Sequence, residues 1–152
     1  MFDEARPSQE YMFARQRVLI VEDNEEHGVL LRAVLAHSEL DVSTFVVGSL
    51  KEARTHLLAQ DRFGDQGDRA MPSLILLDLW LPDGHGFEML EWLSRVFPNI
   101  PVLVLTSSER PEDRQRSLEL GAKDFRTKPT DFHEVVGVVR ELLAEWQDCA
   151  GV

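Results

Sequence analysis

Residues 73–86 read Ser-Leu-Ile-Leu-Leu-Asp-Leu-Trp-Leu-Pro-Asp-Gly-His-Gly, an apolar run that ends on the carboxylate of Asp78. Consecutive apolar residues of this kind suit a strand that is buried on both faces of a parallel sheet. Turn-forming residues follow directly behind Asp78. The stretch therefore predicts a carboxylate at the carboxyl edge of the sheet, which is where open α/β folds bind ligands.

A second apolar run, residues 18–21, ends in the same way, because Glu22, Asp23 and Asn24 follow it. Two buried strands would thus bring three carboxylates to one edge. Three like charges without a counter-ion repel one another, and at least one of them would retain its proton. A hard divalent cation removes this repulsion, and Mg²⁺ prefers carboxylate, carbonyl, water and phosphate oxygens. The pattern predicts a Mg²⁺ site around a potential nucleophile, Asp78.

Composition limits the function classes. The chain has 152 residues, enough for one domain with a sizeable core, and a net charge of −11. This acidity, with no basic cluster, argues against nucleic acid as a partner. The apolar stretches are too short to cross a membrane. The single cysteine, Cys149, excludes a disulfide framework and fits a reducing compartment, so we expect a cytoplasmic protein.

Apolar runs alternate with amphipathic stretches at regular spacing, which predicts repeated β–α units and a parallel sheet. The expected strands are residues 18–21, 41–47, 73–77, 101–105 and 122–127. The expected helices are residues 25–37, 49–59, 86–97, 112–120 and about 131–146. We expect one α/β domain, a doubly wound (βα)5 unit over residues 16–147, between tails at 1–15 and 148–152. Residues 61–72 read as a surface loop.

Two of these helices carry apolar positions that predict their packing. In the first, the buried face is expected from residues at helical spacing, Val29, Leu30, Ala33 and Val34. In the last, an apolar arc of about 160° is wider than a core-facing helix requires. It consists of Phe132, Val135, Val136, Val139, Leu142, Leu143 and Trp146, extended by Val138. Two interpretations stay open: a deeply seated helix, or a homodimer built on its margin near Trp146.

The remaining strand ends add a hydroxyl and an ammonium to the acidic edge. Thr106 follows the fourth expected strand, and Lys128 follows the fifth. Together with Glu22, Asp23 and Asp78 they offer a carboxylate nucleophile, a metal site and two partners for phosphoryl oxygens. The combination is that of a phosphoryl-accepting site.

Four short motifs occur in this order at the expected strand ends. They are Val21-Glu22-Asp23-Asn24, Asp78-x-x-x-Pro82-x-x-x-Gly86, Thr106-Ser107 and Lys128-Pro129. In these motifs the chain resembles the receiver domain of two-component response regulators, over residues 17–146. The Val-Glu-Asp-Asn opening, the Asp-Leu-x-Leu-Pro string and the long loop before the third strand are most similar to phytochrome-associated single-domain regulators.

The resemblance implies a flavodoxin-like fold with strand order 2-1-3-4-5. It also implies that Asp78 is the phosphoacceptor and that Asp23 and Glu22 serve Mg²⁺ directly or through water. The backbone carbonyl of Trp80, two residues after the phosphoacceptor, would be a further metal ligand. Phosphorylation would come from a sensor histidine kinase, and a phytochrome is one candidate.

The resemblance assigns further roles around the phosphoryl group. Thr106 and Lys128 would bind its oxygens, and Phe125 stands at the switch-aromatic position of the family. Trp80 and Ser108 occupy the positions that admit or exclude the water that hydrolyses the acyl phosphate. We expect a stand-alone response regulator that is no enzyme beyond its own aspartyl phosphorylation and dephosphorylation.

Three other functions are alternatives to this one. A haloacid-dehalogenase-type phosphatase needs a second acid two residues after the nucleophile, where this chain has Trp80. A flavodoxin needs a hydroxyl- and Gly-rich phosphate loop after the first strand, and the acidic residues 22–26 would repel phosphate. A degenerate receiver, acting as a phosphorylation-independent interaction module, stays open. The five histidines lack metal-ligand spacing and read as surface or loop residues.

Overall fold

The computed structural model describes residues 16–62 and 71–150. Within them, five parallel strands form one sheet in the order β2-β1-β3-β6-β7, which confirms the predicted order 2-1-3-4-5. The strands are β1 (Gln16–Val21), β2 (Val42–Val47), β3 (Leu74–Leu77), β6 (Val102–Thr106) and β7 (Asp124–Thr127). The expected tail at 1–15 and most of the expected loop at 61–72 lie outside the described residues.

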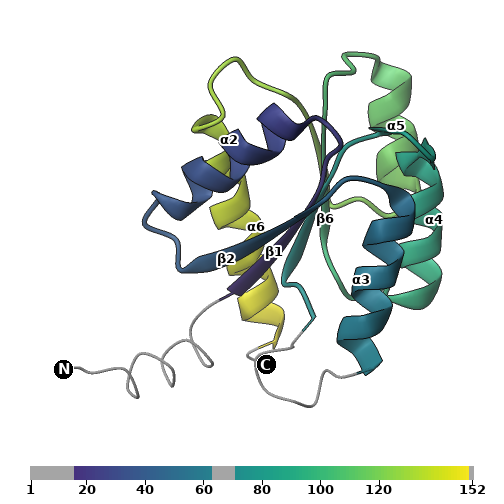
Figure 1. Cartoon of the computed structure of the whole chain (residues 1–152), viewed down its shortest axis with the longest axis horizontal. Coiled ribbons are helices and arrows are strands. Elements are labelled where there is room, and N and C mark those ends of the chain that lie inside the picture. Colours follow the sequence, from purple (N-terminus) through teal and green to yellow (C-terminus); the bar gives the residue numbers. More distant parts are fainter. Residues whose placement is uncertain (1–15, 63–70, 151–152) are drawn as a thin grey trace.

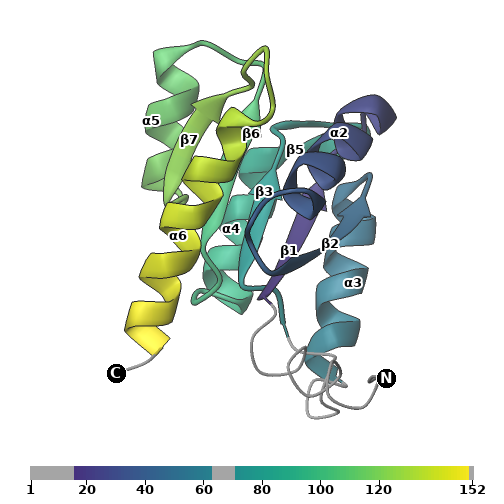
Figure 2. The same ribbon diagram turned by 90° about the vertical axis from the view of Figure 1, so that its left-hand side faces the viewer.

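Helices cover both faces of this sheet (Figures 1 and 2). They are α2 (Glu25–Ala36), α3 (Leu50–Arg62), α4 (Gly86–Val96), α5 (Pro111–Glu119) and α6 (Glu134–Ala150). Helices α2 and α6 lie on one face, and α3, α4 and α5 lie on the other. Each face therefore has its own apolar layer, as in a doubly wound α/β domain. Within the described residues, no helix is both long and apolar enough to span a bilayer.

The central strands are buried because helices pack on both of their faces. Every residue of β3 is buried, and so are residues 18–21 of β1. Continuous burial explains why these strands are uninterrupted apolar runs rather than alternating ones. The candidate functional polar residues consequently lie at the ends of the strands.

Two local features differ from the expectation. A two-stranded antiparallel hairpin, β4 (Trp80–Leu81) with β5 (Gly84–His85), follows Asp78 where only a turn was expected. Helix α6 runs to Ala150 instead of about residue 146 and starts at Glu134, after a turn in which the Asp131 carboxylate accepts from the His133 N–H.

The buried face of α2 also differs from the prediction. Val29 and Leu30 are 61 and 46 % exposed, whereas Gly28, Leu31 and Leu35 are buried along with the expected Val34. Gly28 explains the rotation, because a Cβ there would stand only 3.2 Å from the Val46 side chain. The helix approaches β2 closely along its glycine, and this turns the next apolar positions toward solvent.

The apolar arc of α6 is a core face. Its described members are all buried, namely Phe132, Val135, Val136, Val139, Leu142 and Leu143. Val138 is partly buried against the same cluster. The Trp146 side chain lies outside the described part of the chain. The deeply seated helix accounts for this arc without a second copy, and the homodimer stays an untested prediction.

Candidate functional site

The sheet register brings the polar strand ends together. The backbone N–H of Asp78 donates to the carbonyl of Val21 at 3.0 Å, and that of Lys128 donates to the carbonyl of Thr106 at 2.7 Å. The main-chain ladder thus continues one residue beyond the strands and places each side chain beside its neighbour. Glu22 and Asp23 follow β1, Asp78 follows β3, Thr106 ends β6 and Lys128 follows β7.

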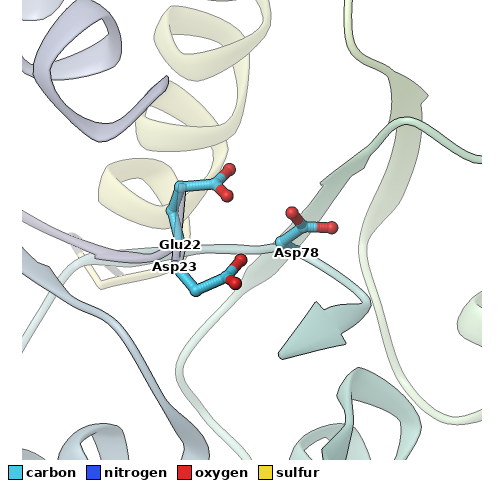
Figure 3. A group of neighbouring side chains, drawn as sticks. All are labelled: Glu22, Asp23 and Asp78. Atoms are coloured by element: carbon cyan, nitrogen blue, oxygen red, sulfur yellow. The ribbon is translucent and has the colours of Figure 1, made fainter. Parts of the chain in front are cut away.

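Three carboxylates meet at this edge, as the sequence predicts. Glu22, Asp23 and Asp78 each offer an oxygen within 4.8 Å of the others (Figure 3). Glu22 and Asp78 are buried, with 4 and 6 % of their surface exposed, whereas Asp23 is open to solvent. Such a set of hard oxygen donors with one open side fits a magnesium ion that keeps several of its waters.

The electrostatics of Glu22 reflect this crowding. Burial raises the pKa of its carboxyl, and the nearby Asp78 adds to the rise, while hydrogen bonds from Lys128 and from the Asn24 N–H act against it. The carboxylate form of Glu22 is therefore costly even beside Lys128. A divalent cation would relieve that cost.

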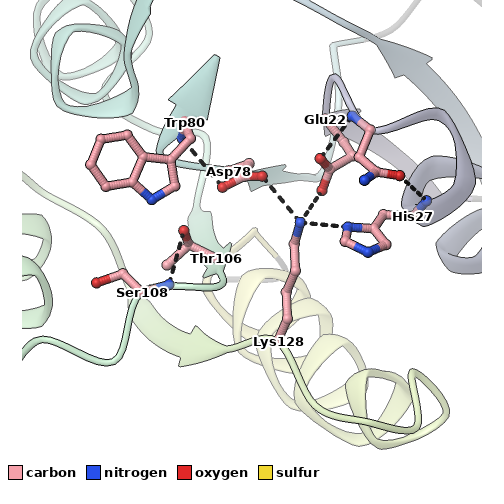
Figure 4. A network of polar contacts seen from close by, with 8 residues as sticks. Glu22, His27, Asp78, Trp80, Thr106, Ser108 and Lys128 are labelled. Atoms are coloured by element: carbon pink, nitrogen blue, oxygen red, sulfur yellow. Dashed lines mark hydrogen bonds and ion pairs between the residues drawn. The ribbon is translucent and has the colours of Figure 1, made fainter.

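Lys128 closes the site from the other side. Its Nζ lies 2.7 Å from Glu22 Oε1 and 3.1 Å from Asp78 Oδ2, and its side chain is only 9 % exposed. The same Nζ lies 2.9 Å from Nδ1 of His27 (Figure 4). The ammonium is thus in direct contact with the expected nucleophile.

Thr106 and Trp80 complete the surroundings of Asp78. Thr106 is fully buried, and its hydroxyl points toward the Asp78 carboxylate in Figure 4. Its Oγ1 accepts a long hydrogen bond from the Ser108 N–H, at 3.5 Å. The Trp80 N–H donates to Asp78 Oδ1 at 3.3 Å. The indole is 51 % exposed and stands edge-on to the ring of His85, with 4.9 Å between the ring centres.

Ser108 and Phe125 are engaged elsewhere in this state. The Ser108 hydroxyl donates to Asp113 Oδ2 at 2.5 Å and accepts from the Arg110 N–H, so it ties the β6–α5 loop together. Phe125 is buried in the core, 4 % exposed, and its carbonyl accepts from Arg114 at 2.9 Å. The Phe125 ring therefore already occupies an interior position, and its role as a switch stays a prediction.

Two residues of the site escaped the sequence interpretation. His27 was read as a surface histidine, whereas it lies partly buried against Lys128. The one available signal was its position in the first turn of the helix that follows the acidic motif. Gly86 was noted only as part of a motif. A Cβ there would come within 2.9 Å of the Asp78 carbonyl oxygen, so glycine lets α4 begin directly beside the acidic residue.

Comparisons with known proteins agree with this arrangement. The family model of the response regulator receiver domain matches residues 18–140. The transcriptional activator protein IrlR of Burkholderia pseudomallei is 37 % identical over 131 residues, which cover 86 % of this chain and 52 % of IrlR. The probable methanogenesis regulatory protein FilR2 of Methanothrix harundinacea is 32 % identical, with 85 and 82 % of the two chains covered. The chain spans about half the length of IrlR and of several other curated relatives that it matches.

Solved structures show the same likeness. The phosphorylated cyanobacterial phytochrome response regulator RcpA superposes with a TM-score of 0.72 at 28 % identity, covering 88 % of this chain and 94 % of RcpA. The Mn²⁺-bound form of response regulator Rcp1 gives 0.69 at 29 % identity, covering 86 and 94 %. The chain therefore belongs to the family of response regulator receiver domains, which serve two-component signalling and are not conventional enzymes.

Proposed function

We propose that this receiver accepts a phosphoryl group on Asp78 from a sensor histidine kinase, in a Mg²⁺-dependent step of a two-component phosphorelay. The observation that carries the proposal is the contact of the Lys128 ammonium with Asp78, 3.1 Å apart, beside a group of three carboxylates. A nucleophilic carboxylate, a fixed cation and a hard-metal site are the parts that phosphoryl transfer needs.

In this step an oxygen of Asp78 attacks phosphorus, and the bond from phosphorus to the kinase histidine breaks. Lys128 stays against the accepting carboxylate and neutralises charge that gathers on the phosphoryl oxygens. The Thr106 hydroxyl, which points toward Asp78, donates to one of those oxygens. The product is an aspartyl phosphate at the end of β3.

Glu22, Asp23, Asp78 and the carbonyl of Trp80 would hold the Mg²⁺ ion. When bound, the ion supplies positive charge to the phosphoryl oxygens and relieves the repulsion among the carboxylates. The open side at Asp23 gives it a route of entry. The Mn²⁺-bound form of Rcp1, a structural neighbour, supports a divalent cation in this family.

The kinase that serves this receiver is proposed to be a phytochrome. The support is that RcpA is a phytochrome response regulator and is 28 % identical to this chain. Purified histidine kinases with and without a phytochrome sensor module, each labelled on histidine, test the idea. The phytochrome kinase should transfer its label fastest, and equal or slower transfer would contradict it.

Labelling with acetyl phosphate tests the chemistry without a kinase. The wild-type protein should take up one phosphoryl group in Mg²⁺ and none in EDTA. Asp78→Asn should take up none, because an amide does not attack phosphorus. Asp61→Asn, which changes an exposed carboxylate, is the matched control and should be labelled normally. A wild-type protein that took up no label would favour the phosphorylation-independent interaction module.

A further inference from the structure

Lys128 has an acceptor for each of its donors. An ammonium group carries three N–H bonds and no acceptor. Glu22 Oε1, Asp78 Oδ2 and His27 Nδ1 lie 2.7, 3.1 and 2.9 Å from its Nζ. Two of these acceptors are carboxylates of the acidic site, and His27 is the third (Figure 4). The geometry thus gives the histidine a defined place next to the proposed phosphoryl-accepting group.

The contact defines which form of the imidazole is present. The Lys128 ammonium can only donate, so Nδ1 of His27 must accept, and the ring proton is then on Nε2. A protonated ring would place two cations 2.9 Å apart. The described geometry therefore requires neutral His27.

Two further contacts fix the backbone and the ring of His27. Its backbone N–H donates to the Asn24 side chain at 3.0 Å, which anchors it in the first turn of α2. Its ring stands edge-on to Phe132, with 5.6 Å between the ring centres. Because the first turn of α2 fixes the backbone and Phe132 packs against the imidazole, Nδ1 is a preorganised acceptor.

The other two acceptors have a second task. Glu22 and Asp78 belong to the carboxylate group that fits a metal, so their oxygens are shared between Lys128 and that site. His27 lies apart from this group and has no such competition. The Lys128 side chain is only 9 % exposed, so water gives little replacement for a lost acceptor.

We propose that His27 is a positioning residue of the phosphoryl-accepting site: Nδ1 accepts an N–H of Lys128 and holds the ammonium against Asp78. The inference rests on the proposed function of Asp78. His27 does not touch the phosphoryl group and acts through Lys128 alone.

A crossed pair of variants separates positioning from packing. His27→Phe keeps a ring against Phe132 and removes the acceptor. His27→Asn removes the ring and keeps an amide oxygen close to the place of Nδ1. Labelling of Asp78 by acetyl phosphate in saturating Mg²⁺ should be about tenfold slower in His27→Phe and within about threefold of wild type in His27→Asn, since one hydrogen bond to a charged group is at stake.

Three results would overturn the proposal: equal rates in all three proteins, a loss in His27→Asn that matches the loss in His27→Phe, or a loss in His27→Asn alone. Thermal unfolding of each variant confirms that the folded protein is compared. Failure of the proposed function is a separate result, because wild type itself would then take up no label on Asp78.

A second measurement needs no phosphorylation. Nitrogen-15 NMR of the His27 ring in the wild-type protein should show a bare Nδ1 and a protonated Nε2. The chain has three lysines, and in a Lys51→Arg, Lys123→Arg background the remaining side-chain ammonium signal belongs to Lys128. That signal should exchange slowly with water and broaden in His27→Phe. A protonated Nδ1, or an ammonium signal unchanged in His27→Phe, would contradict the contact.

Discussion

Glu22 shows how a single residue can favour binding at the expense of stability. Burial raises the pKa of its carboxyl above the ordinary 4.5, so the folded protein holds the proton more tightly than the unfolded chain. The stability from this group is complete below pH 4.5 and is lost as the pH rises through the pKa of the folded state. The ionised carboxylate that a metal requires is the form that the fold tolerates least.

We therefore expect Glu22→Gln to gain melting temperature relative to wild type as the pH rises from 4 to 8 in EDTA. The same variant should bind Mg²⁺ more weakly, because a charged oxygen donor is lost. Thermal unfolding across this pH range and a Mg²⁺ titration measure the two effects. Glu91→Gln, on the exposed side of α4, should show neither. A pH-independent difference between wild type and Glu22→Gln would contradict the role of burial.

We predict that Trp80 controls the lifetime of the phosphorylated form. The Trp80 backbone N–H donates to the Asp78 carboxylate, and the exposed indole lies beside the acidic site. The Ser108 hydroxyl donates to Asp113 instead. Neither side chain can act as a base for an attacking water, so we predict a phosphorylated form that lasts hours rather than seconds. Loss of label in excess Mg²⁺ should be faster in Trp80→Asn and nearly unchanged in Trp80→Phe. Equal rates in wild type and Trp80→Asn would contradict the idea that the Trp80 indole shields the aspartyl phosphate from water.

At the scale of secondary structure, the start of α4 determines the backbone at Asp78. A Cβ on Gly86 would stand 2.8 Å from the Leu79 Cα and 2.9 Å from the Asp78 carbonyl oxygen. Both are main-chain atoms, which cannot turn aside as a flexible side chain can. The helix and the strand end approach each other this closely only because residue 86 has no side chain.

Gly86→Ala should consequently destabilise the fold by about 1–3 kcal/mol and slow the labelling of Asp78, because either α4 or the residue that carries the nucleophile must shift. Gly137→Ala is the matched control. It lies inside α6, where the nearest atom to an added Cβ is 4.0 Å away, so it should stabilise the helix by about 0.5–1 kcal/mol. Chemical denaturation of both variants measures the two changes in the free energy of unfolding. Equal changes in the two variants would contradict the prediction.

At the scale of the whole molecule, we predict that the site is coupled to a surface through β6, β7 and α5. Thr106 ends β6 beside Asp78, and Arg114 of α5 donates to the Phe125 carbonyl on β7. A phosphoryl group adds roughly two negative charges and strong acceptors at Asp78. Since Thr106 would be drawn toward those oxygens, the elements behind it should move with it.

Binding of beryllofluoride, a mimic of the phosphoryl group, should therefore shift backbone amide signals in α5 and β7 as well as next to Asp78. In Thr106→Ala the shifts beside Asp78 should remain, and those in α5 should shrink, because the hydroxyl that links them is gone. Two-dimensional amide NMR with and without the mimic measures this. Unchanged α5 and β7 signals in the wild-type protein would contradict the predicted coupling between the site and this surface.

The amino-acid sequence alone was sufficient to predict the parallel sheet and the group of polar side chains at the strand ends. Apolar runs of strand length, separated by helix-length amphipathic stretches, admit few arrangements other than a parallel sheet. In such a sheet the carboxyl ends of neighbouring strands meet by construction. Glu22, Asp23, Asp78, Thr106 and Lys128 therefore come together without any knowledge of how the helices pack.

Contacts that depend on the rotation of a helix or on the position of a turn could not be predicted from the sequence, because tertiary packing determines them. The face of α2 follows from the close approach of Gly28 to β2, a fact about two packed backbones that a hydrophobic pattern does not contain. Asp83 accepts from the N–H groups of Leu50 and Lys51 at the start of α3, across more than thirty residues of chain. The contact of His27 with Lys128 spans 101 residues and exists because that rotation of α2 brings the imidazole over the end of β7. Periodicity places a residue on an element, but only the packing of the elements decides which side chain it meets.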